Sequence, residues 1–364
     1  MHETFRKYRA AVINAYRADD LADDVGLFIS APLVRYVLFA LHNYPNKKGH
    51  YYSNAIKFRL IHILLTTQRR KYLIHSTRYI FSMLVVGVPS GLALCDYLSR
   101  AALTPAVAME HDGIEFDEGA FIPALPFAPV GAGDIHSLDA SHAVLLDRST
   151  SMVSLVSFER TLVPLLGRGL LATNADEAAA LCGCFPLDAA IVATMAAAQS
   201  NFVWSPSLFQ LIGLNSNKPG LLTTTVNERR KRRLGIHFDS WDSLPMHMRA
   251  RGRYRLSVNV GAGDRFFLFM VATATDVLDV MNADMSETIN ATDMLRLAMQ
   301  RLPKPTVYRL RIPPMWGYVA QTDYLPHDGS TFGAGLFDFS AHMLADFRPS
   351  KNYFRSMSLH HVTR

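Results

Sequence analysis

The sequence has 364 residues, a formal net charge of +6 and a pI of about 9.2. Hydrophobic residues make up 49% of it and charged residues only 19%, with a mean hydropathy of +0.10, whereas a typical soluble domain carries about 25% charged residues. The length allows one large domain or two ordinary ones. The cysteines, Cys95, Cys182 and Cys184, are too few for a disulfide framework and favour a reducing compartment.

The low charge content fits either a membrane protein or a protein whose surface is covered by neighbouring subunits. Residues 79–95 are uncharged, but they are fewer than the roughly 20 apolar residues that a spanning helix needs. Pro89, Ser90 and Gly91 also interrupt them. We therefore expect a buried helix, a turn and a second buried helix here, and no membrane partner.

The first half of the chain shows helical periodicity. Apolar side chains recur every three or four residues in 2–20, and further helices are predicted at 32–44, 53–66 and 72–86. Residues 119–134 hold three prolines and three glycines, which indicates an irregular connection. Helical patterns return at 151–166, 175–182 and 186–200.

After about residue 220 the period changes to two. In 253–260 the side chains of Arg253, Arg255, Ser257 and Asn259 share one face, which predicts a half-buried strand. The apolar run 265–272 predicts a strand buried on both faces, joined to the first as a hairpin through 261–264. A helix that begins after Asn290 and strands at 306–312 and 315–322 complete the prediction.

These patterns predict an α+β fold, with a helix-rich N-terminal part and a smaller antiparallel sheet in the C-terminal part. We expect three parts: a basic helical part at 1–118, a linker with a second helical part at 119–220, and a sheet-containing part at 221–364. The three could also form one continuous compact unit.

Charge is segregated along the chain. Residues 25–95 contain no Asp or Glu but nine basic residues, whereas 101–147 contain eight acidic residues and no Lys or Arg. Basic residues among aromatic ones suit a nucleic-acid surface. Alternatively, the acidic and basic segments neutralise each other within the fold or across a subunit contact. The candidate contact residues of the first segment are Lys47, Lys48, Arg69, Arg70 and Lys71.

The stretch 227–233 reads NERRKRR and is the sharpest charge feature. Its five consecutive cations, Arg229, Arg230, Lys231, Arg232 and Arg233, cannot all face a core. These side chains must therefore be exposed or paired with negative groups, so the run suits contact with a polyanion or with another protein.

No catalytic signature is found. HExxH, GxSxG, Walker and kinase patterns are absent, and no histidine is assigned to a metal site. The acidic loop His111, Asp112, Glu115, Asp117 and Glu118 lacks calcium-loop spacing, which favours a solvated loop over a cation site. We therefore predict no catalytic, cofactor-binding or metal-binding residue.

The thinly charged chain, rich in Arg, Met and Tyr, and its segment RGRYRLSVNVGAGDRFFLFMVATATDVLDVM (251–281) resemble the clamp proteins of turreted reoviruses. The resemblance implies a structural protein of a double-stranded RNA virus without enzymatic activity. It would cement the inner capsid shell and contact shell subunits, copies of itself and viral RNA. Its location would be the virion, and the host cytoplasm during assembly. A non-structural single-stranded RNA-binding protein is the alternative, and an enzyme of RNA metabolism is the third hypothesis.

Overall fold

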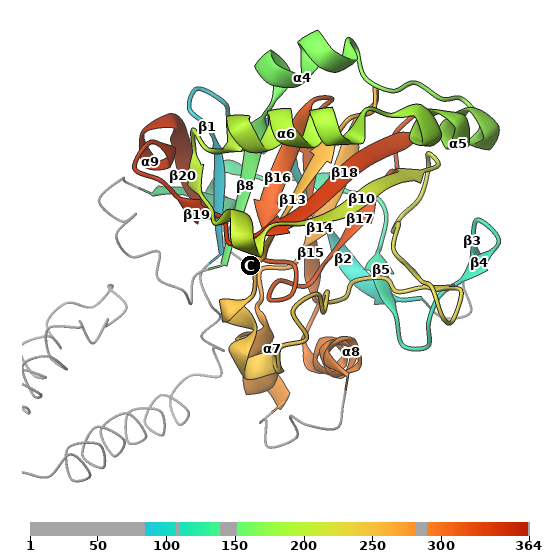
Figure 1. Ribbon diagram of the computed structural model, residues 1–364. Coiled ribbons are helices and arrows are strands. Elements are labelled where there is room, and N and C mark those ends of the chain that lie inside the picture. The colour runs from blue at the N-terminus through green and yellow to red at the C-terminus, as the bar shows by residue number, and fades with distance from the viewer. Residues whose placement is uncertain (1–83, 107–109, 139–150, 282–289, 363–364) are drawn as a thin grey trace, which may run out of the picture. The chain divides into compact units, whose positions relative to one another are not determined.

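The computed structural model describes residues 84–106, 110–138, 151–281 and 290–362. All of them belong to the second of two units into which the chain divides, Ile80–Arg364. They form two β-sheets that pack face to face, with helices on the outer sides (Figure 1).

The larger sheet has eight strands in the order β10-β18-β13-β16-β8-β1-β20-β7. It is mixed, because β1 and β8 run parallel while the other neighbours are antiparallel. Its strands are β1 (Leu84–Pro89), β7 (Ile135–Leu138), β8 (Ser151–Ser157), β10 (Gln210–Asn217), β13 (Tyr254–Asn259), β16 (Trp316–Ala320), β18 (Asp338–Ala345) and β20 (Met357–Val362).

The smaller sheet has the order β17-β14-β15-β2-β5, with β6 also pairing with β2. Its strands are β2 (Leu98–Pro105), β5 (Phe121–Pro123), β6 (Ala128–Pro129), β14 (Arg265–Phe269), β15 (Thr306–Ile312) and β17 (His327–Ser330). Short strands pair outside both sheets: β3 (Glu110–His111) with β4 (Ile114–Glu115), β11 (Val226–Asn227) with β12 (Arg232–Arg233), and β9 (Phe202–Val203) with β19 (Arg348–Pro349).

Helices cover the outer faces of both sheets. The larger sheet packs against α4 (Glu159–Leu166), α5 (Ala175–Cys184) and α6 (Leu187–Ala198), and the smaller one against α7 (Ala274–Met281) and α8 (Ala291–Arg301) (Figure 1). The remaining helical segments are α9 (Tyr353–Ser356) and the 3₁₀ turns η1 (Leu94–Asp96), η2 (Ala132–Asp134), η4 (Pro206–Leu208) and η5 (Met246–Arg251).

Strand β14 shows how the sequence builds this layering. Phe267 and Phe269 point between the two sheets, whereas Leu268 and the following Met270 point toward α7 and α8. All four side chains are buried, and each contributes about 1.5–3 kcal/mol on leaving water. The prediction of a strand buried on both faces is confirmed.

The predicted fold class is wrong. The described chain is rich in sheet from Leu84 onward, and the large sheet is mixed rather than small and antiparallel. Part of the predicted helix at 72–86 is strand β1, so the helix–turn–helix expected at 79–95 is wrong, and 151–166 divides into β8 and α4. A buried strand and a buried helix segment are both short, continuous apolar runs, so periodicity alone does not separate them.

The predicted hairpin over 253–272 is also wrong. Strand β13 pairs with β16 and β18 in the larger sheet, while β14 pairs with β15 and β17 in the smaller one. The glycine-rich turn 261–264 therefore carries the chain from one sheet to the other. Two neighbouring strands thus face each other across the space between the sheets.

Other predicted elements are confirmed. They are α5, α6, β15, β16 and α8, whose N-cap Asn290 accepts a hydrogen bond from the backbone N–H of Thr292 at 2.8 Å. The predicted helices at 2–20, 32–44 and 53–66 lie outside the described residues. The three predicted parts remain a prediction, although β8 and β10 from 119–220 share a sheet with β16 and β18 from 221–364.

Candidate metal centre

Two histidines face each other on neighbouring segments that are distant in sequence. His237 lies between β12 and η5, and His327 begins β17. Their backbones form an isolated antiparallel bridge, with N–H···O=C distances of 3.1 and 2.9 Å in the two directions. The bridge places the imidazole centroids 4.9 Å apart. Asp239 follows His237 by two residues, which in extended chain returns its carboxylate to the same side.

Hydrogen bonds to backbone carbonyls fix the orientation of both rings. The Nδ1 of His237 lies 2.8 Å from the carbonyl of Gly235, and the Nδ1 of His327 lies 3.0 Å from that of Leu325. A carbonyl oxygen only accepts, so each Nδ1 donates a proton to its carbonyl. Each Nε2 is therefore the ring atom left to bind a proton or a metal ion, and both Nε2 atoms face the carboxylate of Asp239.

The distances suit a shared metal ion. Nε2 of His237 lies 3.6 Å from Oδ1 of Asp239, and Nε2 of His327 lies 3.4 Å from Oδ2. One potential ligand atom from each residue lies within 4.8 Å of the other two. Ligands about 2.1 Å from one ion are themselves roughly 3.0–3.4 Å apart at angles of 90–110°. The two histidine–aspartate distances lie at and just above the upper end of that range, so side-chain rotations would be needed to bring all three atoms to one ion. Two histidines and one carboxylate on one side of a metal form the facial triad of non-haem Fe(II) sites.

Arginines hold the Asp239 segment. The guanidinium of Arg255 donates to Oδ2 of Asp239 at 3.1 Å. Arg249 donates to the backbone carbonyl of Asp239 at 2.6 Å and to that of Asp323 at 2.8 Å. These contacts place the carboxylate before any ion arrives, which lowers the cost of ordering the site.

The electrostatics of the site keep Asp239 ionised. Burial would raise the pKa of Asp239, but the positive charges of His327 and Arg255 and the contact with His237 hold that pKa well below its ordinary value. Burial would lower the pKa of His237, but Asp239 and the charge of Asp328 hold that pKa above its ordinary value. A cation beside both histidines is therefore favoured electrostatically, whether it is a proton or a metal ion.

The space between the sheets is polar next to this site. Ser257 of β13 and His342 of β18 are buried there, and Arg265 of β14 donates to Ser257 at 3.1 Å. Burial, together with the charges of Arg255 and Arg265, holds the pKa of His342 well below its ordinary value. The polar face of β13, predicted to meet solvent, instead lines the interior beside Asp239.

The basic run 229–233 forms a hairpin turn, and three of its arginines lie near carboxylates of the acidic loop. Arg230 lies 3.4 Å from Asp117, Arg232 lies 2.8 Å from Glu115, and Lys231 lies 3.1 Å from Glu228. Arg233 is buried and donates to the carbonyl of Thr223 at 2.9 Å. We call Asp112, Glu115, Asp117, Arg230, Arg232 and Arg233 the outer charge cluster.

The acidic loop therefore has basic partners within this part of the fold. Asp112 contacts Lys218 and lies 3.8 Å from Arg233, and Asp117 also lies 3.4 Å from the buried Arg296. These pairs favour mutual neutralisation over cation binding by the loop. The predicted contacts with RNA or with a second protein stay predictions. The other candidate residues, Lys47, Lys48, Arg69, Arg70 and Lys71, lie outside the described residues.

Sequence analysis singled out none of the three residues of this candidate centre. His237 and Asp239 stand two apart in GIHFDSW, so on extended chain they share a side. His327 lies 88 positions after Asp239 by subtraction of the residue numbers, and only the fold brings it near. The i, i+2 pair was the one local signal, and it is too short to distinguish a ligand pair from chance.

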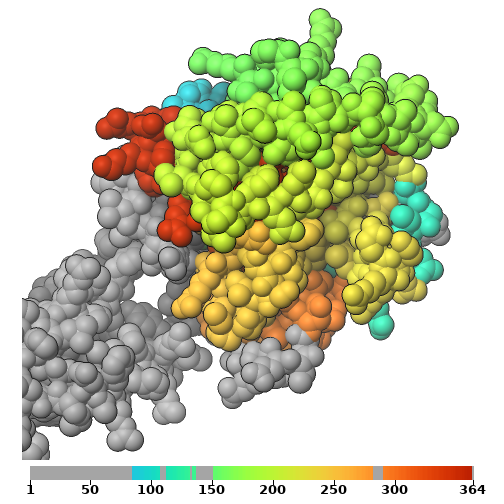
Figure 2. Space-filling view, viewed as in Figure 1, coloured from blue at the N-terminus to red at the C-terminus, as the bar shows by residue number. Residues whose placement is uncertain are grey.

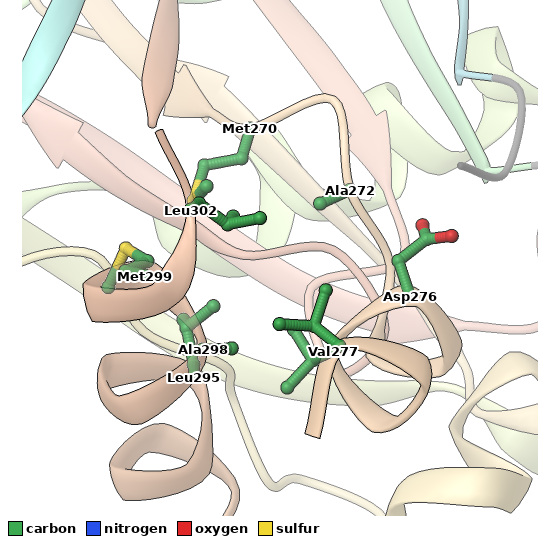
Figure 3. A pocket seen from close by; sticks show the side chains of 9 residues that line it. Met270, Ala272, Asp276, Val277, Leu295, Ala298, Met299 and Leu302 are labelled. Carbon is green, nitrogen blue, oxygen red and sulfur yellow. The ribbon is translucent and has the colours of Figure 1, made fainter. Parts of the chain in front are cut away.

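An apolar cavity of about 10 Å³ lies between α7 and α8. Figure 3 shows Met270, Val277, Leu295 and Leu302 around it. That volume is about one water molecule, so we regard it as a packing defect rather than a ligand site.

Within the described ranges, no single helix is long and apolar enough to cross a membrane. The pair α5 and α6 meets the length and composition criteria together, with a bend of 73° between the two helices. No protein-family model matches the sequence, and comparisons with curated proteins and with solved structures find no match.

Proposed function

We propose that this protein is a mononuclear metal-dependent oxidoreductase in which His237, Asp239 and His327 hold Fe(II). The observation that carries the proposal is that the Nε2 atoms of both histidines face one carboxylate, at 3.4 and 3.6 Å. Both rings have their Nδ1 at hydrogen-bond distance from a carbonyl, so Nε2 is the atom of each ring that would bind the ion.

His237, Asp239 and His327 would hold the Fe(II), and the ion would supply oxidation chemistry with dioxygen. The protein orients the ligands and limits access of water. His237 and His327 are 2% exposed, whereas the side chains of Asp239 and Arg255 are 11% and 14% exposed. Asp239 is therefore the least buried of the three candidate ligands.

Anaerobic titration tests the proposal. We expect one Fe(II) per chain, and nitric oxide added afterwards should give the electron paramagnetic resonance signal of an iron–nitrosyl complex, because an open position remains. Failure to bind Fe(II) would contradict the proposal, as would bound Fe(II) that does not react with nitric oxide. Zn(II) binding without Fe(II) binding would indicate a different metal protein.

Assembly into a larger particle is a second candidate function, in line with the resemblance to virion clamp proteins. What supports it is the layer of α4 to α6 and the chain that follows (Figure 2). No Lys or Arg occurs between Arg168 and Lys218. Exposed apolar side chains there include Leu171 at 57%, Val192 at 70% and Val203 at 62%, and such residues mark protein contacts when they gather.

Sedimentation tests this second candidate. The full chain should self-associate, or bind shell subunits, less strongly after the double substitution Val192→Asp and Val203→Asp. Leu297→Asp, on α8 at the opposite side of the two sheets, is the matched control and should change nothing. A monomeric protein with no shell partner would contradict the assembly function.

A further inference from the structure

Asp328, the residue after His327, is a fully buried carboxylate whose two oxygens have different surroundings. Its Oδ1 accepts hydrogen bonds from the backbone N–H groups of Thr224, Thr225 and Gly329 at 3.2, 3.1 and 2.6 Å. It also accepts one from the Thr225 hydroxyl at 2.8 Å. These donors hold the carboxylate in place and favour its ionised form, which opposes the effect of burial, and burial raises the pKa of Asp328 above its ordinary value.

The other oxygen, Oδ2, accepts no hydrogen bond in the described structure. It lies 3.7 Å from Nδ1 of His237, beyond hydrogen-bond distance. The Nδ1 proton is directed at the carbonyl of Gly235 instead. At 0% exposure, the charge of Asp328 acts on the imidazole with little screening by water.

A buried carboxylate oxygen without a hydrogen-bond partner is unfavourable for stability. Simple anchoring of residues 224 and 225 would need only Oδ1. The orientation of Oδ2 toward His237 therefore calls for a separate explanation. A negative charge beside the Nδ1–H group increases electron donation by Nε2 to a bound metal.

We propose that Asp328 is a positioning residue of the metal centre, which strengthens metal binding by His237 through the charge of Oδ2. This inference rests on the proposed function. It assigns Asp328 no contact with the metal or the substrate. The same charge also acts on the buried guanidinium of Arg233.

Two nearly isosteric substitutions separate charge from anchoring. Asp328→Asn removes the charge but keeps an oxygen to accept the four hydrogen bonds. Thr225→Val keeps the charge but removes the hydroxyl donor at 2.8 Å. A purely structural role predicts that the two variants behave alike.

The experiment is a titration of the metal-free full chain with Co(II), followed by its visible absorption. We expect Asp328→Asn to bind Co(II) about 10- to 100-fold more weakly than the unsubstituted protein, with a shifted ligand-field band. Thr225→Val should stay within about threefold and keep the original band, since outer contacts that carry no charge have smaller effects. Equal losses in both variants, or an Asp328→Asn variant with unchanged affinity and absorption, would overturn the inference.

Failure of the proposed function gives a different result from failure of the inference alone. If the proposed function is wrong, the unsubstituted protein itself binds no Co(II), and the inference fails as well. If Asp328→Asn does not fold, Asp328→Glu and Asp328→Gln replace it. Both variants lengthen the side chain and disturb the hydrogen bonds of Oδ1 in the same way, but only Asp328→Glu keeps the negative charge. The Glu variant should bind Co(II) more tightly than the Gln variant, and equal affinities would overturn the inference.

Discussion

The outer charge cluster and the candidate metal centre are neighbours along the chain, joined by Leu234, Gly235 and Ile236, and they differ in how much of their charge is exposed. In the outer charge cluster, Arg230, Arg232 and Glu115 are 45–66% exposed, although Asp117 and Arg233 are buried. In the metal centre, no ligand side chain exceeds 11% exposure. The outer cluster dominates the sequence, whereas the metal centre leaves only one histidine–aspartate pair. The number of charges in a segment therefore indicates little about chemistry, and burial decides how strongly each charge acts.

Among the substitutions that distinguish the two clusters, we expect the one at Asp239 to have the largest effect. Asp239→Asn removes the only negative ligand, so we expect metal affinity to fall by more than about 100-fold, beyond the effect of residues that touch a ligand only from outside. Asp242→Asn is the control, since that carboxylate pairs with Arg253 at 2.7 Å and offers the metal nothing. Calorimetric titration measures both variants. Equal affinities in the two would contradict the assignment of Asp239.

Within the outer charge cluster, burial should again determine the size of the effect. Asp117 is 4% exposed and pairs with Arg296, itself 6% exposed. Asp117→Asn leaves that guanidinium with less compensation and should lower the free energy of unfolding by about 3 kcal/mol. Glu115→Gln, at 66% exposure, should cost less than about 1 kcal/mol. Denaturant unfolding compares the two, and similar losses would refute the distinction.

The polar interior beside the metal centre should make stability depend on pH. The folded pKa of His342 is well below its ordinary value because of burial and then of Arg255 and Arg265, while the unfolded side chain takes up a proton near pH 6.5. The unfolded state thus binds more protons below that pH, and the free energy of unfolding falls as pH decreases from about 6.5. In the metal-free protein, His342→Gln should flatten this decline in urea titrations. An unchanged pH profile would contradict the placement of His342.

The smallest effect should come from the exposed cations. The triple substitution of Arg229, Arg230 and Arg232 by Ser should change the free energy of unfolding by less than about 1 kcal/mol. Arg233→Ser alone should cost more, because this side chain is buried and bonded to Thr223. Thermal unfolding of the two variants will show whether Arg233 differs from its neighbours.

Strand β13 shows how far the sequence could lead. Its period-two pattern was read correctly as a strand, and its apolar face does meet the helices through Leu256 and Val258. The polar face was assigned to solvent, because alternation usually has that meaning. Here Ser257 and Asn259 are fully buried between the sheets. The alternation of polar residues shows that they share one face of the strand. That this face lies in the interior is visible only in the structure, where the second sheet covers it.

The rest of the fold could not be predicted because it depends on pairing between residues that are far apart in the sequence. His327 and the segment containing His237 pair across 90 positions by their residue numbers, and no local propensity encodes such a contact. The same limit explains the failed hairpin, since Arg265 lies close to Arg255 in sequence but in the other sheet. By contrast, α8 was predictable because its cap at Asn290 and its apolar stripe are local signals.

X-ray absorption spectroscopy of the Fe(II)-loaded protein tests whether His237, Asp239 and His327 bind the ion. We expect two imidazole ligands and one carboxylate at about 2.0–2.2 Å, with one imidazole lost in His327→Ala. An iron atom surrounded only by oxygen ligands, or a spectrum that His327→Ala leaves unchanged, would contradict this assignment.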